Sequence, residues 1–189
     1  MNSILKFDTD IFYLINNRLT SPALDVFFPY ITQKFNFLGI IIIAAALIWF
    51  MGNRRDRFGL ILLVLAVGLN DFASDILKHL FMRLRPCSAL EGARVLVGCG
   101  GSFSMPSSHA SNIFTAMVFL STRYKKFTPV FLVIAVLVAY SRVYVGVHYP
   151  SDIMVGAIFG TGIAFLFYFA DKKYTPVLFD YFSKKRGSV

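Results

Sequence analysis

Charged residues are scarce in this chain: they make up 15% of its 189 residues, where soluble domains usually contain about a quarter. Hydrophobic residues make up 57% of the chain, and the mean hydropathy is +0.65. This balance excludes an ordinary soluble domain and favours an integral membrane protein. The net charge is +9, but the basic residues stand in short clusters beside apolar runs. That placement is typical of topology signals and lipid contacts, so we expect the membrane bilayer, and not nucleic acid, as a partner.

Cysteine is equally scarce, since Cys87 and Cys99 are the only two and both fall in one loop. No other metal-ligating side chains cluster with them, so a zinc site is weakly supported, and we expect neither a metal nor another cofactor. A disulfide would form between them if the loop lay outside the cytoplasm, and two free thiols fit the sequence equally well. The first ten residues lack a signal-peptide pattern, so we expect the membrane spans themselves to drive insertion.

Long apolar runs predict an all-α integral membrane helix bundle, because a helix satisfies all its backbone groups within one segment. Residues 1–20 place apolar side chains at helical spacing, which predicts an amphipathic helix lying in the membrane interface. A short apolar helix follows from Pro22, and these two elements make an N-terminal region over 1–33. We expect about five to six transmembrane helices in a bundle over 34–172, followed by a basic cytoplasmic tail over 173–189. Five spans are predicted at about 36–51, 57–82, 106–122, 128–144 and 150–170.

The basic residues also predict which way the bundle faces. With five spans, residues 52–57, residues 123–126 and the C-terminal tail share one side, and that side carries most of the loop arginines and lysines. The positive-inside rule makes this side cytoplasmic. Three stretches that join charged or titratable side chains to the ends of spans then open on the other side. These stretches are Lys78–Pro86, Pro106–His109 and Tyr140–Asp152. The charges place them on a periplasmic or extracellular face, and we expect the periplasmic face of a bacterial inner membrane.

The first feature these stretches share is positive charge, which is costly at the end of a span and usually marks function. Lys78 and Arg85 are seven residues apart, two helical turns, so both lie along one face if the helix continues that far. Arg142 supplies a third cation. The planar fork of arginine suits two phosphate oxygens, and lysine acts as a point charge. Each cation alone could be an interfacial anchor, but three at one face favour a phosphate site.

Pro106–His109 is typical of a helix start, with Pro106 at the first helical position. The free amides of a first helical turn, at the positive end of the helix dipole, favour an anion. We expect the Ser107 hydroxyl to add a contact with phosphate, and Ser108 in the same turn to contribute. His109 is placed to donate a proton to a leaving group, although a histidine bonded to a loop carbonyl also fits the pattern.

His148 and Asp152 are four residues apart across a turn that Pro150 introduces. A carboxylate on one imidazole nitrogen fixes the tautomer and leaves the other nitrogen free to attack phosphorus. This pair predicts a phosphohistidine intermediate. The alternative is a structural pair that caps the last span, and two residues alone do not exclude it.

Together the three stretches resemble the signature of the type-2 phosphatidate phosphatases, a family of membrane lipid phosphatases. The resemblance covers about 71–156, with K-x6-R-P, P-S-x-H and S-R-x5-H-x3-D in order. It implies a metal-independent phosphatase whose nucleophile is His148, whose general acid is His109, and in which Asp152 orients His148. Its implied phosphate ligands are Lys78, Arg85, Arg142 and Ser107.

One position departs from this family: Ser108 stands where a glycine is usual, and we expect an ordinary helical backbone there. The predicted substrate is a phospholipid or glycolipid phosphate of the cell envelope, lipid A 1-phosphate first. Undecaprenyl pyrophosphate and phosphatidylglycerol phosphate are the alternatives. A lipid-binding or transport protein without catalysis is the competing class, although the chain shows no repeated half. Haloperoxidase chemistry at the same predicted phosphate site is another alternative, but it is less compatible with so apolar a composition.

Overall fold

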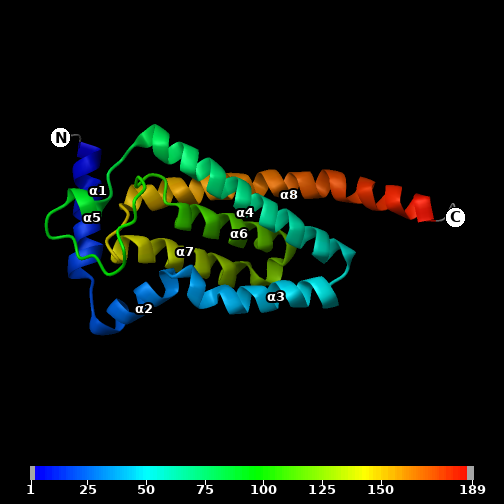
Figure 1. The fold of residues 1–189 in the computed structure, drawn as a ribbon, viewed down its shortest axis with the longest axis horizontal. Helices are drawn as coiled ribbons and strands as arrows, with labels where there is room; N and C mark the ends of the chain where they lie inside the picture. Colours follow the sequence, from blue (N-terminus) through cyan, green and yellow to red (C-terminus); the bar gives the residue numbers. More distant parts are fainter. Residues whose placement is uncertain (1–2, 187–189) are drawn as a thin grey trace.

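The computed structural model describes residues 3–186 and contains only helices and connecting segments within that range (Figure 1). The α-helices are α1 (Ser3–Tyr13), α2 (Pro22–Thr32), α3 (Leu38–Met51), α4 (Arg54–Phe81), α5 (Pro86–Ala89), α6 (Ser108–Arg123), α7 (Thr128–Tyr144) and α8 (Pro150–Arg186). A π-helical turn, η1 (Leu14–Arg18), and two 3₁₀ turns, η2 (Lys34–Phe37) and η3 (Lys125–Phe127), connect some of them. The predicted all-α class is confirmed.

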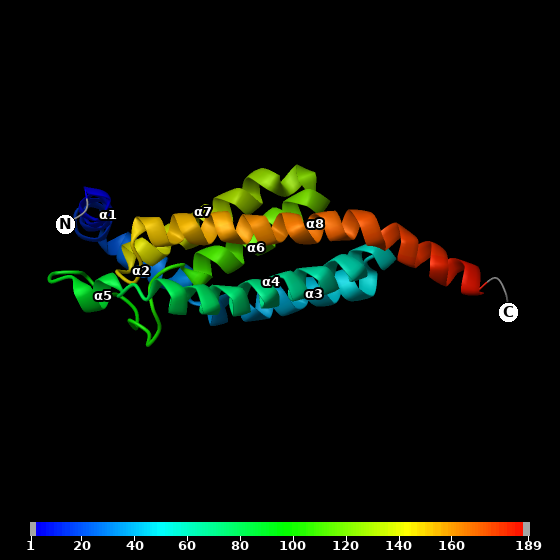
Figure 2. The same cartoon turned by 90° about the horizontal axis from the view of Figure 1, so that it is seen from above.

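The long helices form a bundle along one axis, with α6 between α4, α7 and α8 (Figures 1 and 2). Glycines allow α6 and α8 to approach closely. A Cβ atom on Gly156 would lie 2.7 Å from the Ser107 carbonyl oxygen, and one on Gly160 would lie 2.1 Å from that of Ser111. Such small-residue contacts are common between helices in membranes, where they let backbones meet.

Three of the described helical segments are long and apolar enough to cross a membrane, and a bent pair would make a fourth. The three are Arg54–Ala89, Lys125–Tyr144 and Pro150–Pro176, and the pair, Pro22–Thr32 with Phe35–Met51, is bent by 75°. The helix α6, predicted as a further span, has 16 residues, which is too short to be included in this count, but it packs against α4, α7 and α8 inside the bundle. Because α6 lies inside the bundle, it carries polar side chains where a lipid-facing helix would be apolar.

The polar side chains of α6 bond to α4. The Ser111 hydroxyl donates to Asn70 Oδ1 at 2.6 Å, and Asn112 Nδ2 donates to Asp71 Oδ1 at 2.8 Å. Asn70 and Ser111 are fully buried, so these bonds satisfy groups that would otherwise be costly in an apolar bundle.

The N-terminal segment crosses the end of the bundle where α8 begins (Figures 1 and 2). The side chain of Asn16 joins it to that end: Nδ2 donates to the carbonyl oxygens of Tyr144 at 2.7 Å and of Arg94 at 2.8 Å, and Oδ1 accepts from the Arg94 amide. The predicted start of α2 is confirmed, with Ser21 as N-cap and Pro22 in the first turn. The sequence leaves two placements open for residues 1–33, in the membrane interface or dipping into the bilayer, and the interfacial one stays a prediction.

The end of α4 differs from the expectation that Lys78 and Arg85 share one helix. The helix ends at Phe81, and Met82 takes a left-handed conformation with φ of 45°. Arg85 instead precedes the short helix α5, whose first residue is Pro86. Because a proline disfavours helical backbone at the preceding residue, the helix cannot run through Arg85.

The two cysteines are joined by a disulfide, with their Cα atoms 6.0 Å apart, so of the two alternatives the structure has the bridged one. The bridge closes the loop that holds α5. At the other end, α8 continues through the segment predicted to be a tail, as far as Arg186. The helix includes Pro176, which removes one backbone donor without ending it.

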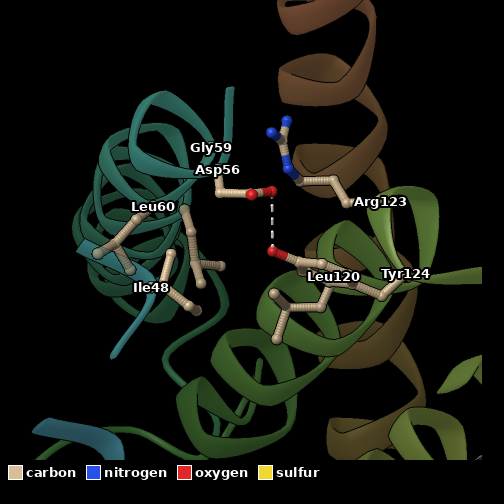
Figure 3. A pocket seen from close by; sticks show the side chains of 8 residues that line it. Ile48, Asp56, Gly59, Leu60, Leu120, Arg123 and Tyr124 are labelled. Atoms are coloured by element: carbon tan, nitrogen blue, oxygen red, sulfur yellow. Dashed lines mark hydrogen bonds between the residues drawn. The ribbon is translucent and has the colours of Figure 1, made fainter. Parts of the chain in front are cut away.

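The far end of the bundle, away from α1, is held by a buried arginine of α6 (Figure 3). Arg123 forms a salt bridge with Asp171 of α8 and donates to the Arg55 carbonyl oxygen at 2.5 Å. The Tyr124 hydroxyl donates to Asp56 at 3.2 Å across the same space. A cation with two good acceptors clamps α4, α6 and α8 together there.

Candidate active site

The three predicted stretches meet at the end of the bundle that α1 crosses. The Ser107 amide, just before α6, donates to the carbonyl oxygen of Asp152 at 3.1 Å. The segment after α4 reaches the same point, because Arg85 Nη1 lies 3.2 Å from His148 Nε2. Segments far apart in the chain therefore surround one imidazole.

His148 and Asp152 form the predicted pair, and both side chains are buried. His148 Nδ1 lies 3.5 Å from Asp152 Oδ2. Arginine can only donate, so Nε2 accepts from Arg85 and the imidazole proton is assigned to Nδ1, on the side of the carboxylate. This tautomer directs the Nε2 lone pair toward the cations, as a nucleophile at phosphorus requires.

The protonation state of His148 fits the same role. Burial lowers the pKa of the imidazole from 6.5 to about 4, although the nearby Asp152 carboxylate opposes this shift. The side chain is therefore neutral at neutral pH, with its lone pair available.

Three buried cations from different elements lie at this end of the bundle, and one of them, Arg85, contacts the imidazole. Arg85 is held by Ser102, whose carbonyl oxygen accepts from Nε at 2.8 Å and whose hydroxyl accepts from Nη2 at 3.1 Å. Arg142 donates from Nη1 to the Thr32 hydroxyl at 2.6 Å, but its buried Nε has no acceptor. Lys78, on α4, is 6% exposed. None of the three has a carboxylate within salt-bridge distance among the described residues.

A buried positive charge without a counterion costs free energy, because it has lost its contacts with water. It becomes favourable when an anion with several oxygens enters, because each guanidinium N–H then finds a charged acceptor. The orphaned Nε of Arg142 therefore indicates an anion site beside His148.

The first turn of α6 adds to this site and begins two residues later than predicted, at Ser108 instead of Pro106. Ser107 is the N-cap, and its hydroxyl accepts from the Ala110 amide at 3.5 Å. Because a serine hydroxyl can cap the free amides, Pro106 is displaced to the position before the cap. Ser108 is the first helical residue and has no positive φ, as expected. His109, half-buried, follows in the same turn.

Two side chains that hold Asp152 were not predicted. The Ser104 hydroxyl donates a short hydrogen bond to Asp152 Oδ2, and Arg83 Nη1 donates to Oδ1 at 2.8 Å. Arg83 lies inside the charged stretch Lys78–Pro86, so its position at the end of a span was a usable signal. Ser104 is one of several serines in a loop, and nothing in the sequence distinguishes it. No group of three or more His, Cys, Asp or Glu side chains in the described part of the chain is arranged to hold a metal ion.

The chain matches the family model of the PAP2 superfamily over residues 59–175. It is 32% identical to a lipid A 4′-phosphatase of Bacteroides thetaiotaomicron over 93% of this chain and 83% of the relative. It is 33% identical to an undecaprenyl-diphosphatase of Sulfolobus acidocaldarius over 86% of this chain and 77% of that relative.

A solved structure has the same arrangement of helices. The transmembrane PAP2 type phosphatidylglycerolphosphate phosphatase from Bacillus subtilis aligns with a TM-score of 0.76 and 28% identity, over 92% of this chain and 88% of that one. The family model covers more than half of the chain and includes all three stretches around His148. The chain therefore belongs to the PAP2 superfamily, and it is a multi-pass membrane hydrolase that acts on lipid phosphates.

Proposed function

We propose that this protein removes a phosphate group from lipid A at the periplasmic face of a bacterial inner membrane, through a phosphohistidine on His148. The observation that carries the chemistry is the set of buried cations around His148 Nε2, above all Arg142, whose Nε lacks an acceptor. A binding or transport protein would also need cations, but it would not need an imidazole whose free nitrogen faces them.

In the first step, three phosphate oxygens are bound by Lys78, Arg85, Arg142 and the start of α6. These donors stabilise the charge that spreads over the oxygens in the transition state. His148 Nε2 attacks phosphorus, the bond from phosphorus to the lipid oxygen breaks, and His109 gives that oxygen its proton. The Nδ1 proton stays with His148, where Asp152 stabilises the positive charge that develops on the ring.

In the second step, water attacks phosphorus and the phosphorus–nitrogen bond breaks. His109, now neutral, takes a proton from this water, so inorganic phosphate leaves and both histidines return to their starting forms. Ser107 and Ser108 hold the phosphate at the helix start during both steps.

Lipid A is proposed because the relative from Bacteroides thetaiotaomicron is a lipid A 4′-phosphatase and aligns with 93% of this chain. This similarity favours the 4′-phosphate over the 1-phosphate that the sequence suggested first. Undecaprenyl diphosphate is the second candidate, supported by the relative from Sulfolobus acidocaldarius. The periplasmic orientation is supported by the basic residues at the start of α4, at the bundle end opposite His148.

The test is phosphate release by purified protein in detergent micelles containing EDTA, with His148→Ala as the paired variant. The substrates are lipid A, its 1- and 4′-monophosphoryl forms, undecaprenyl diphosphate and phosphatidylglycerol phosphate. We expect the wild type to release phosphate from lipid A and from the 4′-monophosphoryl form, and His148→Ala to release none. If His148→Ala were as active as the wild type, the phosphohistidine mechanism would be contradicted. If the wild type preferred another lipid, that lipid would replace lipid A as the proposed substrate.

A further inference from the structure

Arg83 is not one of the proposed phosphate ligands, but its side chain contacts Asp152, the partner of His148. After the left-handed turn at Met82, the chain runs back toward α8, and the Arg83 carbonyl oxygen accepts from the Ser104 amide at 2.7 Å. The Arg83 guanidinium stacks on the Tyr149 ring, with Cζ 3.8 Å from the ring centroid. Its side chain is 17% exposed. The guanidinium is therefore fixed by its backbone segment and by an aromatic face.

The two ends of the Arg83 fork bind different carboxylates. Nη1 donates to Asp152 Oδ1 at 2.8 Å and to the Ser151 hydroxyl at 2.6 Å. Nη2 donates to Asp8 Oδ2 at 2.6 Å. Since Asp8 belongs to α1 and Asp152 to α8, Arg83 joins the N-terminal helix to the carboxylate that orients His148.

Asp8 is itself held firmly. It is 6% exposed, and its Oδ1 accepts from the Ser151 amide at 2.9 Å in the first turn of α8. Its Oδ2 accepts from the Ser151 hydroxyl at 2.5 Å as well as from Arg83. A carboxylate at the start of a helix is favoured by the helix dipole, so Asp8 is a stable anchor for the guanidinium.

The two carboxylate oxygens of Asp152 contact different groups. Oδ2 faces His148 Nδ1 at 3.5 Å and also accepts from Ser104 and from the Tyr149 amide. Arg83 is the side-chain donor to Oδ1. Because the carboxylate is planar, holding Oδ1 fixes its rotation and thereby directs Oδ2 at the imidazole.

We propose that Arg83 and Asp8 are positioning residues for the reaction, with Asp8 holding Arg83 and Arg83 holding the plane of the Asp152 carboxylate. In this arrangement α1 is part of the catalytic unit as well as a cover over the end of the bundle. The inference rests on the proposed roles of His148 and Asp152.

The experiment is a double-mutant cycle on the full-length protein in micelles, with lipid A as substrate. Arg83→Gln is measured alone and in an Asp152→Asn background. Loss of a side chain that orients a reacting group typically costs about 10- to 100-fold in activity, so we expect kcat to fall by about that factor in the wild-type background with KM nearly unchanged. In the Asp152→Asn background we expect a fall of less than about threefold, because the residue through which Arg83 acts is then already altered.

Two further variants keep the result interpretable if Arg83→Gln folds poorly. Arg83→Lys keeps the charge but not the fork, so its kcat should lie between those of Arg83→Gln and the wild type. Asp8→Asn should lower kcat in the same direction by a smaller factor. The matched control is Arg94→Gln. It removes the salt bridge between Arg94, in the loop after α5, and Asp25 of α2, which is 2.6 Å long like the one between Arg83 and Asp8. It should leave kcat unchanged.

An equal fall of kcat in both backgrounds, or an equal fall in Arg94→Gln, would overturn the positioning role. Unchanged kcat in folded Arg83→Gln would overturn it as well. His148→Ala separates this inference from the function on which it rests. If His148→Ala is inactive while the cycle shows no coupling, only the inference about Arg83 fails. If His148→Ala is as active as the wild type, the phosphohistidine mechanism fails.

Discussion

Each end of the bundle contains an arginine with a buried side chain, and the two differ in the acceptors that the protein provides for the guanidinium. Arg123, at the far end, has Asp171 and a backbone carbonyl as acceptors. Arg142, beside His148, has one hydroxyl as acceptor and an Nε without any. Both cations cost free energy to bury, but only the first is compensated within the protein. The first stabilises the fold, and the second supports the proposed anion site.

The largest expected effect comes from removing the uncompensated cation. Arg142→Met should lower kcat/KM by about 100- to 1,000-fold, the usual cost of one donor to transition-state charge. The thermal midpoint should stay the same or rise, because a buried charge without a counterion is replaced by an apolar side chain. Phosphate release and thermal unfolding in the same detergent measure both quantities. A large loss of stability would show that Arg142 is a structural cation like Arg123.

The opposite pattern is expected at the other end. Arg123→Met leaves Asp171 buried without its partner, which should lower the free energy of unfolding by about 3–5 kcal/mol. The kcat of the protein that remains folded should change little, since His148 lies at the opposite end of the bundle. Denaturant or thermal unfolding measures the loss.

A second substitution tests the cause of that loss. Arg123→Met combined with Asp171→Leu removes both charges and should recover most of the stability. Failure to recover would indicate that Arg123 stabilises the bundle by packing and not by its charge.

A smaller effect is expected from the residue that makes room for Arg123. A Cβ atom on Gly59 would lie 2.3 Å from Arg123 Cζ (Figure 3), so Gly59→Ala must displace the clamped guanidinium. Overpacking of this kind costs about 1–3 kcal/mol. Gly68→Ala, on the same helix with nothing within 4 Å of the new atom, is the control and should be neutral or slightly stabilising. Equal effects of the two substitutions would exclude the clamp as the cause.

The last prediction concerns pH and belongs to the His148 end alone. The folded protein protonates His148 only near pH 4, whereas the unfolded chain does so near 6.5, because burial lowers the pKa of the imidazole. Between these values the unfolded state binds the extra proton, so the stability that His148 contributes is complete above about pH 6.5 and falls as the pH decreases. The thermal midpoint should therefore drop more between about pH 7 and pH 4.5 in the wild type than in His148→Gln. If the thermal midpoints of the two proteins changed equally with pH, a buried neutral imidazole at His148 would be contradicted.

Much of the site was predictable because its residues are chemically out of place in an apolar chain. Charged side chains at the ends of spans are costly, so Lys78, Arg85 and Arg142 stood out without any structure, as did the spacing of His148 and Asp152. The helix start at residues 106–109 was predicted to within two residues. The error arose because both a proline and a serine suit a helix start, and only the backbone conformation distinguishes them.

Other features could not be read from the chain. The neighbours of α6 are one example, because its polar side chains bond to α4 inside the bundle and its local pattern does not show which helix they contact. The disulfide was left open because it depends on the folding of the loop and on its compartment. Arg83 and Asp8 are 75 positions apart, and no local pattern connects two residues at that separation.

The sequence by itself determined that this protein is a helical membrane bundle, and it predicted a set of cations and an imidazole suited to phosphate, because composition and local spacing carry that information. The tertiary structure decided which arginine receives a carboxylate and which has a nitrogen without an acceptor. It also decided that α1 reaches the Asp152 carboxylate through Arg83. Partners across a bundle are chosen by packing, and packing depends on contacts between segments that are distant in the chain.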